Sequence, residues 1–380
     1  MNRTEYSRRT HALQAEMDRA GLDALLLTTP PDVFYVTGFL TRFWESPARP
    51  WFVLVPSAGD PVAVIPSIGE LLFSTTWVDD IRTWNAPDPN DDGVSLLADA
   101  ICELVPEHGV LGVPMGLETH LRMPLADLDT LLSRIAPRAL GDATAAVQHV
   151  REVKSEGEVS AIRESCRIAG VAFDRVPEFA RSGCSLDDVF RAFQIACLQA
   201  GADWVSYTAG GAGQGGYGDV IAPATQVPLR QGDVLMLDTG LVRAGYFCDF
   251  DRNYSIGPPD DDVRRAHAAL HKATDAALAG LRPGHTASEL HMLMAGSLVA
   301  DGATPCGGRL GHGLGLSLTE WPSVTPMDRT VLRAGMVLTL EPGVQIAPGR
   351  ILVHEEVIVL RDSGPELLSP RAPTDLPVLD

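Results

Sequence analysis

Five acidic or imidazole side chains in the last third of the chain have the types and spacing of a metal site. They are Asp238 in LMLDTG, Asp249 in YFCDFDRN, His312 in GRLGHGLG, Glu341 in LTLEPG and Glu355 in LVHEEV. Each lies in an apolar, strand-like run or a glycine-rich turn, where an unpaired charge is costly. Four carboxylates and one imidazole that converge in a core repel one another unless cations neutralise them. Oxygen ligands with one nitrogen suit divalent ions such as Mn, Co, Fe or Zn, so the pattern predicts a metal centre.

The spacing of the acids indicates how strands would bring them together. Gly240 and Gly245 lie between two apolar runs, so a hairpin would place Asp238 and Asp249 on neighbouring strands. In an extended HEE run the side chains alternate between faces, so only Glu355 is expected to enter the site. Taken singly, each residue also fits a turn acid, an edge-strand acid or a satisfied core histidine. The five together favour the metal site.

Composition and charge restrict the class of protein. The chain has 380 residues, 45% of them hydrophobic and 21% charged, which predicts a soluble globular protein of two domains. Its formal charge of −19 disfavours binding to nucleic acid and to anionic membranes, although solubility alone also explains it. No apolar stretch is long enough to span a bilayer, and the N-terminus lacks the apolar core of a signal peptide. Six cysteines without a CxxC pair are expected to be reduced thiols, which indicates a cytoplasmic protein.

Residues 1–148 are predicted to form a small α/β domain, because strand-like and helix-like segments alternate there. WFVLVPS and PVAVIPS are expected to form a hairpin, and residues 81–95 are expected to be a loop. The other expected elements are a helix at 4–20, a strand in DALLLTT, a short helix in TPPDVFYVTGF, a helix at 95–105, a strand in GVLGVP and a helix at 122–135.

Residues 149–380 are predicted to be an α+β domain in which helices pack on a curved antiparallel sheet. A long helix is expected from the charged segment REVKSEGEVSAIR onward, and a second helix begins after Ser185 as N-cap. Two further helices are expected at 259–281 and 286–301, the latter with a capping box of Thr286 and Glu289. The expected β-segments are DVLMLDTGLV, GYFCDFDRNYSI, MVLTLEPGVQIA and ILVHEEVIVL.

The ordered set DTG, D-x-x-R, GHGxG, LEPG and HEE resembles the pita-bread metallopeptidase family of methionine aminopeptidase, aminopeptidase P, prolidase and creatinase. The resemblance implies that the five residues above bind two divalent cations and that Glu341 also carries a proton during catalysis. AGLDALLLTTPPDVFYVTGF resembles the creatinase-type accessory domain, and REVKSEGEVSAIR the opening of the catalytic domain in the Xaa-Pro branch. The implied architecture is a creatinase-like, ribonuclease H-like α/β domain at 1–148 and a pita-bread domain at 149–380. A homodimer is implied as well.

Two histidines that this family places near the substrate are absent. One would fall near Val220–Ala222, and Thr319 stands at the place of the other. A preorganised donor of this kind lowers a barrier by roughly 2.7–4 kcal/mol, so other donors are needed for peptide cleavage. The candidates are Tyr207, Tyr217, Thr319 and His354, although a packing role is the alternative for each tyrosine.

Asp251 is a further departure, since the related pattern has threonine there. It lies two residues from Asp249, and in a strand the two side chains share a face. Asp251 is therefore expected to act as an additional ligand or base, or to pair with Arg252 behind the site. The glycine-rich run 209–218 lacks the GK[ST] ending of a phosphate loop, and a flexible wall of the substrate cleft is expected instead.

These patterns predict a dinuclear metal-dependent hydrolase of C–N bonds, in peptides or amides, that resembles Xaa-Pro aminopeptidase and prolidase. Glu341, Asp251, Thr319 and Tyr207 are the expected catalytic residues, acting on a dipeptide or another small molecule. One alternative is a creatinase-like or lyase-like enzyme for a small zwitterionic compound. Another is a non-catalytic binding protein with this fold.

Overall fold

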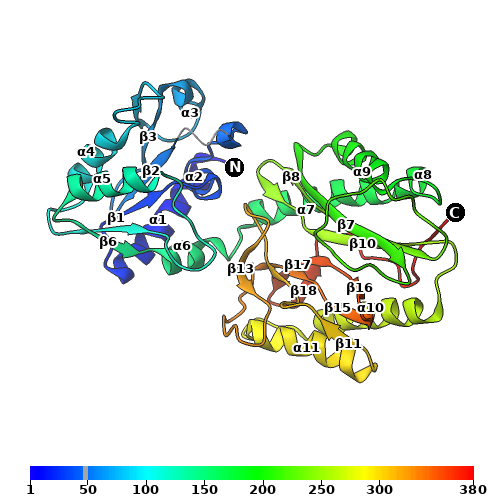
Figure 1. Ribbon diagram of the computed structural model, residues 1–380. Helices are drawn as coiled ribbons and strands as arrows, with labels where there is room; N and C mark the ends of the chain where they lie inside the picture. Colours follow the sequence, from blue (N-terminus) through cyan, green and yellow to red (C-terminus); the bar gives the residue numbers. More distant parts are fainter. Residues whose placement is uncertain (46–49) are drawn as a thin grey trace. The chain divides into compact units, whose positions relative to one another are not determined.

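The protein is described by a computed structural model that covers residues 1–45 and 50–380. The chain divides into two compact units, Met1–Arg151 and Glu152–Asp380 (Figure 1). Among the described helices, none is long and apolar enough to cross a membrane. All six cysteines are free, and Cys166, Cys197 and Cys248 are buried.

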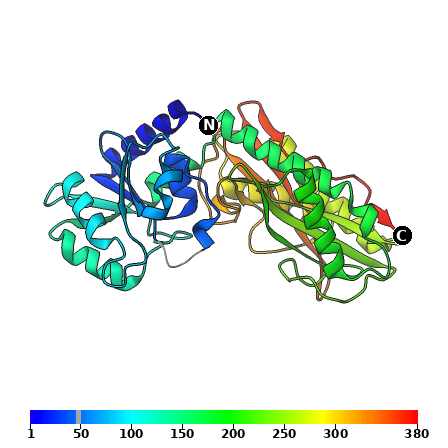
Figure 2. The same cartoon turned by 90° about the horizontal axis from the view of Figure 1, so that it is seen from above.

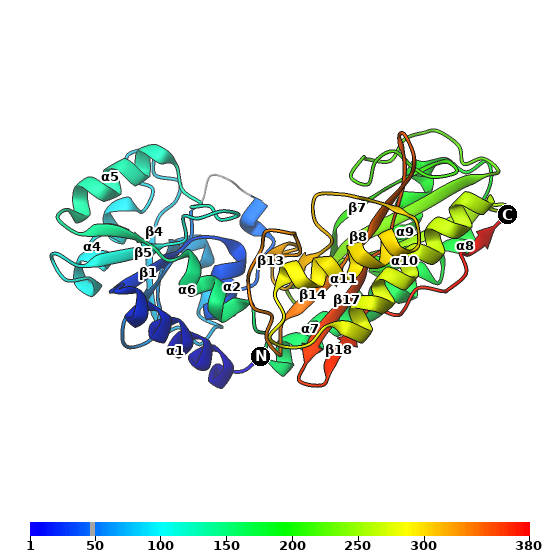
Figure 3. The same cartoon turned by 90° about the horizontal axis from the view of Figure 1, so that it is seen from below.

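The first unit is built on one six-stranded sheet with the order β4-β3-β2-β1-β5-β6. Its strands are β1 (Ala24–Leu27), β2 (Phe52–Pro56), β3 (Val62–Pro66), β4 (Asp80–Trp84), β5 (Val110–Val113) and β6 (Ala139–Asp142). Its helices are α1 (Arg3–Ala20), α2 (Pro30–Thr37), η1 (Phe43–Glu45), η2 (Ser67–Gly69), α3 (Glu70–Phe73), α4 (Val94–Leu104), α5 (Leu125–Ile135) and α6 (Thr144–Arg151). Helices α4 and α5 pack on each other, as do α1 and α6, and the two pairs lie on opposite sides of the sheet (Figure 3). The predicted hairpin is confirmed, since β2 and β3 pair antiparallel.

The prediction of a loop at 81–95 is wrong for its first residues. Residues 81–84 lie in β4, which pairs parallel with β3 at the edge of the sheet. This strand is half-exposed and has no alternating apolar pattern, so periodicity does not reveal it. Backbone pairing and the packing of Trp84 on Phe52, with ring centroids 6.2 Å apart, hold it in place.

The second unit contains two five-stranded sheets, of order β19-β10-β8-β7 with β9 beside β8, and β13-β12-β14-β17-β18. Strands β11, β15 and β16 form a third, smaller sheet. The strands are β7 (Trp204–Gln214), β8 (Asp233–Arg243), β9 (Tyr246–Phe247), β10 (Phe250–Ile256), β11 (Thr304–Cys306), β12 (His312–Gly313), β13 (Glu320–Ser323), β14 (Val337–Leu340), β15 (Gly343–Ala347), β16 (Arg350–Val353), β17 (Glu356–Arg361), β18 (Gly364–Leu367) and β19 (Val378–Leu379).

Five helices of the second unit cover these sheets. They are α7 (Glu156–Phe173), α8 (Val176–Phe179), α9 (Leu186–Ala200), α10 (Asp261–Gly280) and α11 (Ala287–Ala300). Helix α7 packs beside α9 and on β8 (Figure 2), while α10 packs on α11 and on β15 and β18. The predicted caps are confirmed: the Ser185 side chain caps α9, and Thr286 and Glu289 form a capping box on α11.

The glycine-rich run was predicted to be a flexible wall, but up to Gln214 it is the regular strand β7. Its glycines allow close packing. A Cβ atom on Gly210 would lie 2.1 Å from the carbonyl oxygen of Met236 on β8, and the φ of Gly210 is +138°, which favours glycine. The prediction was wrong because glycine is common both in loops and where two backbones approach closely.

Candidate metal centre

The five predicted ligands come from both large sheets of the second unit. Asp238 lies on β8 and Asp249 directly precedes β10, which pairs antiparallel with β8, so the predicted hairpin arrangement is confirmed. His312 lies on β12, Glu341 follows β14 and Glu355 precedes β17. All five line one cavity of about 460 Å³.

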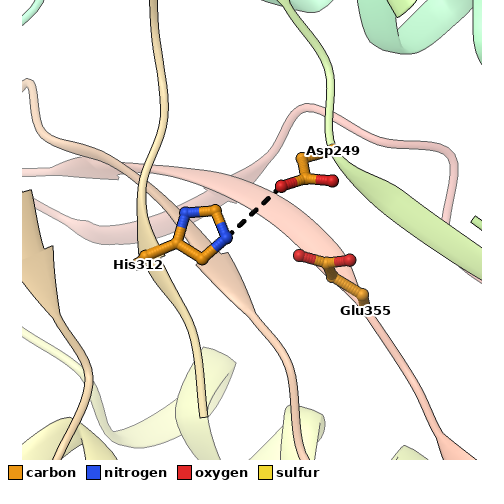
Figure 4. A group of neighbouring side chains, drawn as sticks. All are labelled: Asp249, His312 and Glu355. Carbon is orange, nitrogen blue, oxygen red and sulfur yellow. Dashed lines mark ion pairs between the residues drawn. The ribbon is translucent and has the colours of Figure 1, made fainter. Parts of the chain in front are cut away.

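Three of these side chains are in direct proximity. His312 Nε2 lies 3.3 Å from Asp249 Oδ2, and the ligand atoms of Asp249, His312 and Glu355 all lie within 4.8 Å of one another (Figure 4). Asp238 joins them through Tyr207, whose hydroxyl lies 2.9 Å from Asp238 Oδ2 and 2.6 Å from Asp249 Oδ1. A hydroxyl can donate only one hydrogen, so Tyr207 holds the two carboxylates close together without neutralising both.

Burial and the mutual repulsion of the carboxylates change the pKa values of the groups in this cluster. Burial, followed by the charge of neighbouring carboxylates, raises the pKa of Asp238 and Glu355 well above the ordinary value for carboxyl groups. Burial also raises the pKa of Glu341, and the charge of Asp249 adds to this effect. Burial opposes protonation of His312, but the hydrogen bond and charge of Asp249 leave the pKa of the imidazole raised.

The donor set fits divalent cations. Within the described residues, Asp238 Oδ1, Asp251 Oδ2, Glu341 Oε2 and Glu355 Oε1 are buried and have no hydrogen-bond partner. Such atoms are rare in folded proteins unless an ion or water completes them. His312 Nδ1 lies 2.8 Å from the carbonyl oxygen of Gly313, which can only accept, so Nδ1 carries a hydrogen and Nε2 has its lone pair available for a cation.

Asp251 contributes a further carboxylate to the cavity. It is paired in register with Asp238 across β8 and β10 and is 1% exposed. Its Oδ1 accepts the backbone N–H of Glu355 at 2.9 Å, and its Oδ2 is unpartnered. Arg252 forms its ion pair with Glu356 instead, at 3.1 Å, so the expected pairing with Asp251 is not formed among the described residues.

Two of the four candidate donors lie in the cavity and two do not. Tyr207 and Thr319 line it. The Tyr217 hydroxyl is buried against Asn253 and Val353, which is the packing alternative. His354 lies between β16 and β17 and does not line the cavity; its Nε2 is 2.9 Å from Arg371 Nη1.

Arg309 is the cavity residue that sequence reasoning missed. Its Nη2 donates to Thr319 Oγ1 at 3.3 Å. The signal was a lone cation three residues before His312 in a glycine-rich segment. The cavity wall also includes the two positions at which the family has histidines, which are Val220–Ala222 and Thr319 in this chain.

Changing Asp251 to threonine should lower metal affinity by roughly 10–100-fold, because the variant loses a buried carboxylate that faces the ligands. Metal content after dialysis against buffers of fixed free Mn²⁺ measures this effect. Asp362→Thr, at an exposed position, is the control and should bind as the wild type does. Unchanged metal affinity and unchanged substrate preference in Asp251→Thr would contradict a functional role for this carboxylate.

Comparison with known proteins agrees with this geometry. The model of metallopeptidase family M24 matches residues 160–362, and the creatinase/prolidase N-terminal domain matches residues 9–153. A probable dipeptidase PepE of Mycobacterium tuberculosis is 30% identical over 376 residues, covering 94% of this chain and 93% of the relative. The Xaa-Pro dipeptidase of Pyrococcus horikoshii is 24% identical over 355 residues, covering 92% and 94%.

Solved structures show the same architecture over the whole chain. The dipeptidase PepE of Mycobacterium ulcerans is 27% identical with a TM-score of 0.85, covering 100% of this chain and 99% of that one. A prolidase of Thermococcus sibiricus, 24% identical, has a TM-score of 0.88 with complete coverage of both chains, which shows the shared fold. The protein therefore belongs to metallopeptidase family M24 and is a dinuclear metal-dependent hydrolase of peptide bonds.

Proposed function

We propose that the protein is a dipeptidase that cleaves the single peptide bond of a dipeptide, including Xaa-Pro dipeptides. The observation that carries the proposal is the convergence of five ligand side chains in one cavity of about 460 Å³. That volume lies in the range of small-molecule sites. The similar proteins named dipeptidase and Xaa-Pro dipeptidase support the same substrate class.

In the proposed site Asp238, Asp249, His312, Glu341 and Glu355 would hold two divalent cations. Bound there, the cations would lower the pKa of water and polarise the scissile carbonyl. Glu341 accepts the proton of the attacking water and passes it to the leaving amine, since its Oε2 is unpartnered within the described chain and faces the cavity. Tyr207 keeps Asp238 and Asp249 oriented through its hydroxyl.

The ligand set is rich in oxygen with one nitrogen, so Mn, Co, Fe and Zn all suit it, and Mn is the ion to test first. The proposal includes a homodimer, which the resemblance described above implies, and a cytoplasmic location, which the six cysteines without a CxxC pair indicate. Light scattering of the purified protein tests the dimer.

A second candidate function is action on a small non-peptide zwitterion. The absence of both substrate-site histidines favours it, because Val220–Ala222 and Thr319 supply no imidazole to the cavity wall.

A panel of Xaa-Pro dipeptides, other dipeptides, tripeptides and small zwitterionic amides, assayed with Mn²⁺, tests the proposal. Dipeptides should be hydrolysed at least about tenfold faster than tripeptides in kcat/KM, and a chelator should abolish turnover. Cleavage of the amides alone would support the second candidate and overturn the first.

A further inference from the structure

Arg309 is the one cationic side chain of the cavity wall that has no assigned role. Among the described residues that line the cavity, it is the only arginine or lysine. It forms no ion pair with any described carboxylate, and its single side-chain hydrogen bond goes to Thr319.

The residue after Arg309 and the acceptor of its hydrogen bond are both held by buried contacts. The next residue, Leu310, donates its N–H to the carbonyl of Val324 and accepts the N–H of Glu341, both at 2.9 Å. The hydrogen-bond acceptor Thr319 precedes Glu320, which forms a buried ion pair with Lys154 at 3.0 Å. The position of Arg309 relative to Glu341 is therefore set by backbone hydrogen bonds and not by a free loop.

The charges of the cavity leave Arg309 free for a ligand. Among the described residues, the wall carries five carboxylates, Asp251 included, and none of them forms an ion pair with Arg309. The two divalent cations of the proposed site would be held by these carboxylates, so the guanidinium keeps donors for another anion. Guanidinium groups bind carboxylates through two parallel hydrogen bonds, a geometry that an ammonium group cannot reproduce.

A dipeptide carries its free α-carboxylate one residue from the scissile bond, whereas a longer peptide has an amide at that place. We propose that Arg309, held by Thr319, binds this α-carboxylate and thereby restricts the enzyme to dipeptides. The inference rests on the proposed dipeptidase function and adds the residue that selects substrate length.

The test compares a good dipeptide with the same dipeptide carrying a C-terminal carboxamide, in the Mn²⁺-loaded full-length protein. Wild type should prefer the free carboxylate by roughly 10–100-fold in kcat/KM, the usual effect of a hydrogen bond between charged groups. Arg309→Met should lose this preference, because its kcat/KM for the free dipeptide should fall, mainly through KM, towards the value for the carboxamide. Arg309→Lys should retain part of the preference, because the charge remains and the bidentate geometry does not.

Arg264→Met is the matched control, since this arginine is exposed on α10 and distant in sequence from the cavity wall. Metal content and thermal stability of Arg309→Met should equal those of wild type. If Arg309→Met slows both substrates equally, mainly in kcat, the guanidinium acts on the reacting carbonyl and the proposal is wrong. An equal rate on both substrates by wild type would overturn it too, whereas failure to cleave either would instead refute the dipeptidase function.

Discussion

Replacing Glu355 by glutamine should abolish activity and yet make the metal-free protein more stable. Loss of a metal ligand removes several kcal/mol of transition-state stabilisation, so kcat/KM should fall on the order of 10³-fold or more. In the metal-free protein the substitution also removes a buried charge, because Glu355 is 3% exposed among other carboxylates. The free energy of unfolding should rise by about 1–3 kcal/mol, the penalty of a buried group without partners.

The pH dependence of this stability gain has a defined sign. Burial and the neighbouring carboxylates raise the pKa of Glu355 in the folded state. Its protonated form therefore stabilises the fold below the pKa of an unfolded glutamate, about 4.3, and that stabilisation is lost as pH rises through the raised value. The advantage of Glu355→Gln should be absent at low pH and grow as pH increases.

Urea titrations of chelator-treated protein between pH 4 and pH 8, with metal analysis and dipeptide assays alongside, measure these effects. Glu366→Gln is a suitable control, because Glu366 is a partly exposed residue of β18 that contacts Arg163 and Arg361. Its metal content and activity should be those of wild type. A metal-free Glu355→Gln protein that is less stable than wild type at pH 8 would show that the carboxylates do not repel one another as described.

Changing Lys154 to methionine should destabilise the second unit by about 3–5 kcal/mol, the cost of removing one partner of a buried ion pair. Lys154 Nζ lies 3.0 Å from Glu320 Oε2, and the two side chains are only 2% and 3% exposed. Glu320 also accepts the N–H groups of Leu316 and Ser317, so its charge stays buried in the variant. Denaturant unfolding of the metal-loaded protein measures the loss.

The chain has only two lysines, and the other provides the control. Lys272 pairs with Asp301 at 2.8 Å, but its side chain is 63% exposed. Lys272→Met should therefore change stability by less than about 1 kcal/mol. Adding Glu320→Gln to Lys154→Met should restore part of the loss, because it removes the buried negative charge that Lys154 no longer offsets. Equal effects of the two lysine substitutions would mean that burial of the Lys154 pair has no energetic consequence.

The cluster of proposed metal ligands could be predicted from the sequence because each residue lies in a local pattern that admits few alternatives. Asp238 and Glu341 interrupt or end apolar strands, His312 is flanked by glycines, and strand alternation singles out Glu355 from His354 and Glu356. Helix starts were predictable for the same reason, since Ser185 and Thr286 act on backbone groups within three residues.

Other features depend on contacts between distant segments, which local patterns do not contain. Arg309 and Thr319 are ten residues apart and meet only because β12 and β13 fold back on each other. Strand β4 is defined by pairing with β3 and not by its own residues. Tyr207 and Tyr217 both lie in strand-like or glycine-rich patterns. Only the tertiary structure shows that Tyr207 lines the cavity and that Tyr217 is buried in the core.

The proposed ligands come from two different sheets, and this arrangement has a consequence for the lifetime of the protein. Asp238 and Asp249 belong to the sheet of β8 and β10, and His312, Glu341 and Glu355 to the sheet of β12, β14 and β17. Cations bound by all five would cross-link the sheets, so that neither could open locally without releasing metal. Resistance to proteases would then follow the metal supply, and a cell short of the ion would lose the enzyme itself as well as its turnover.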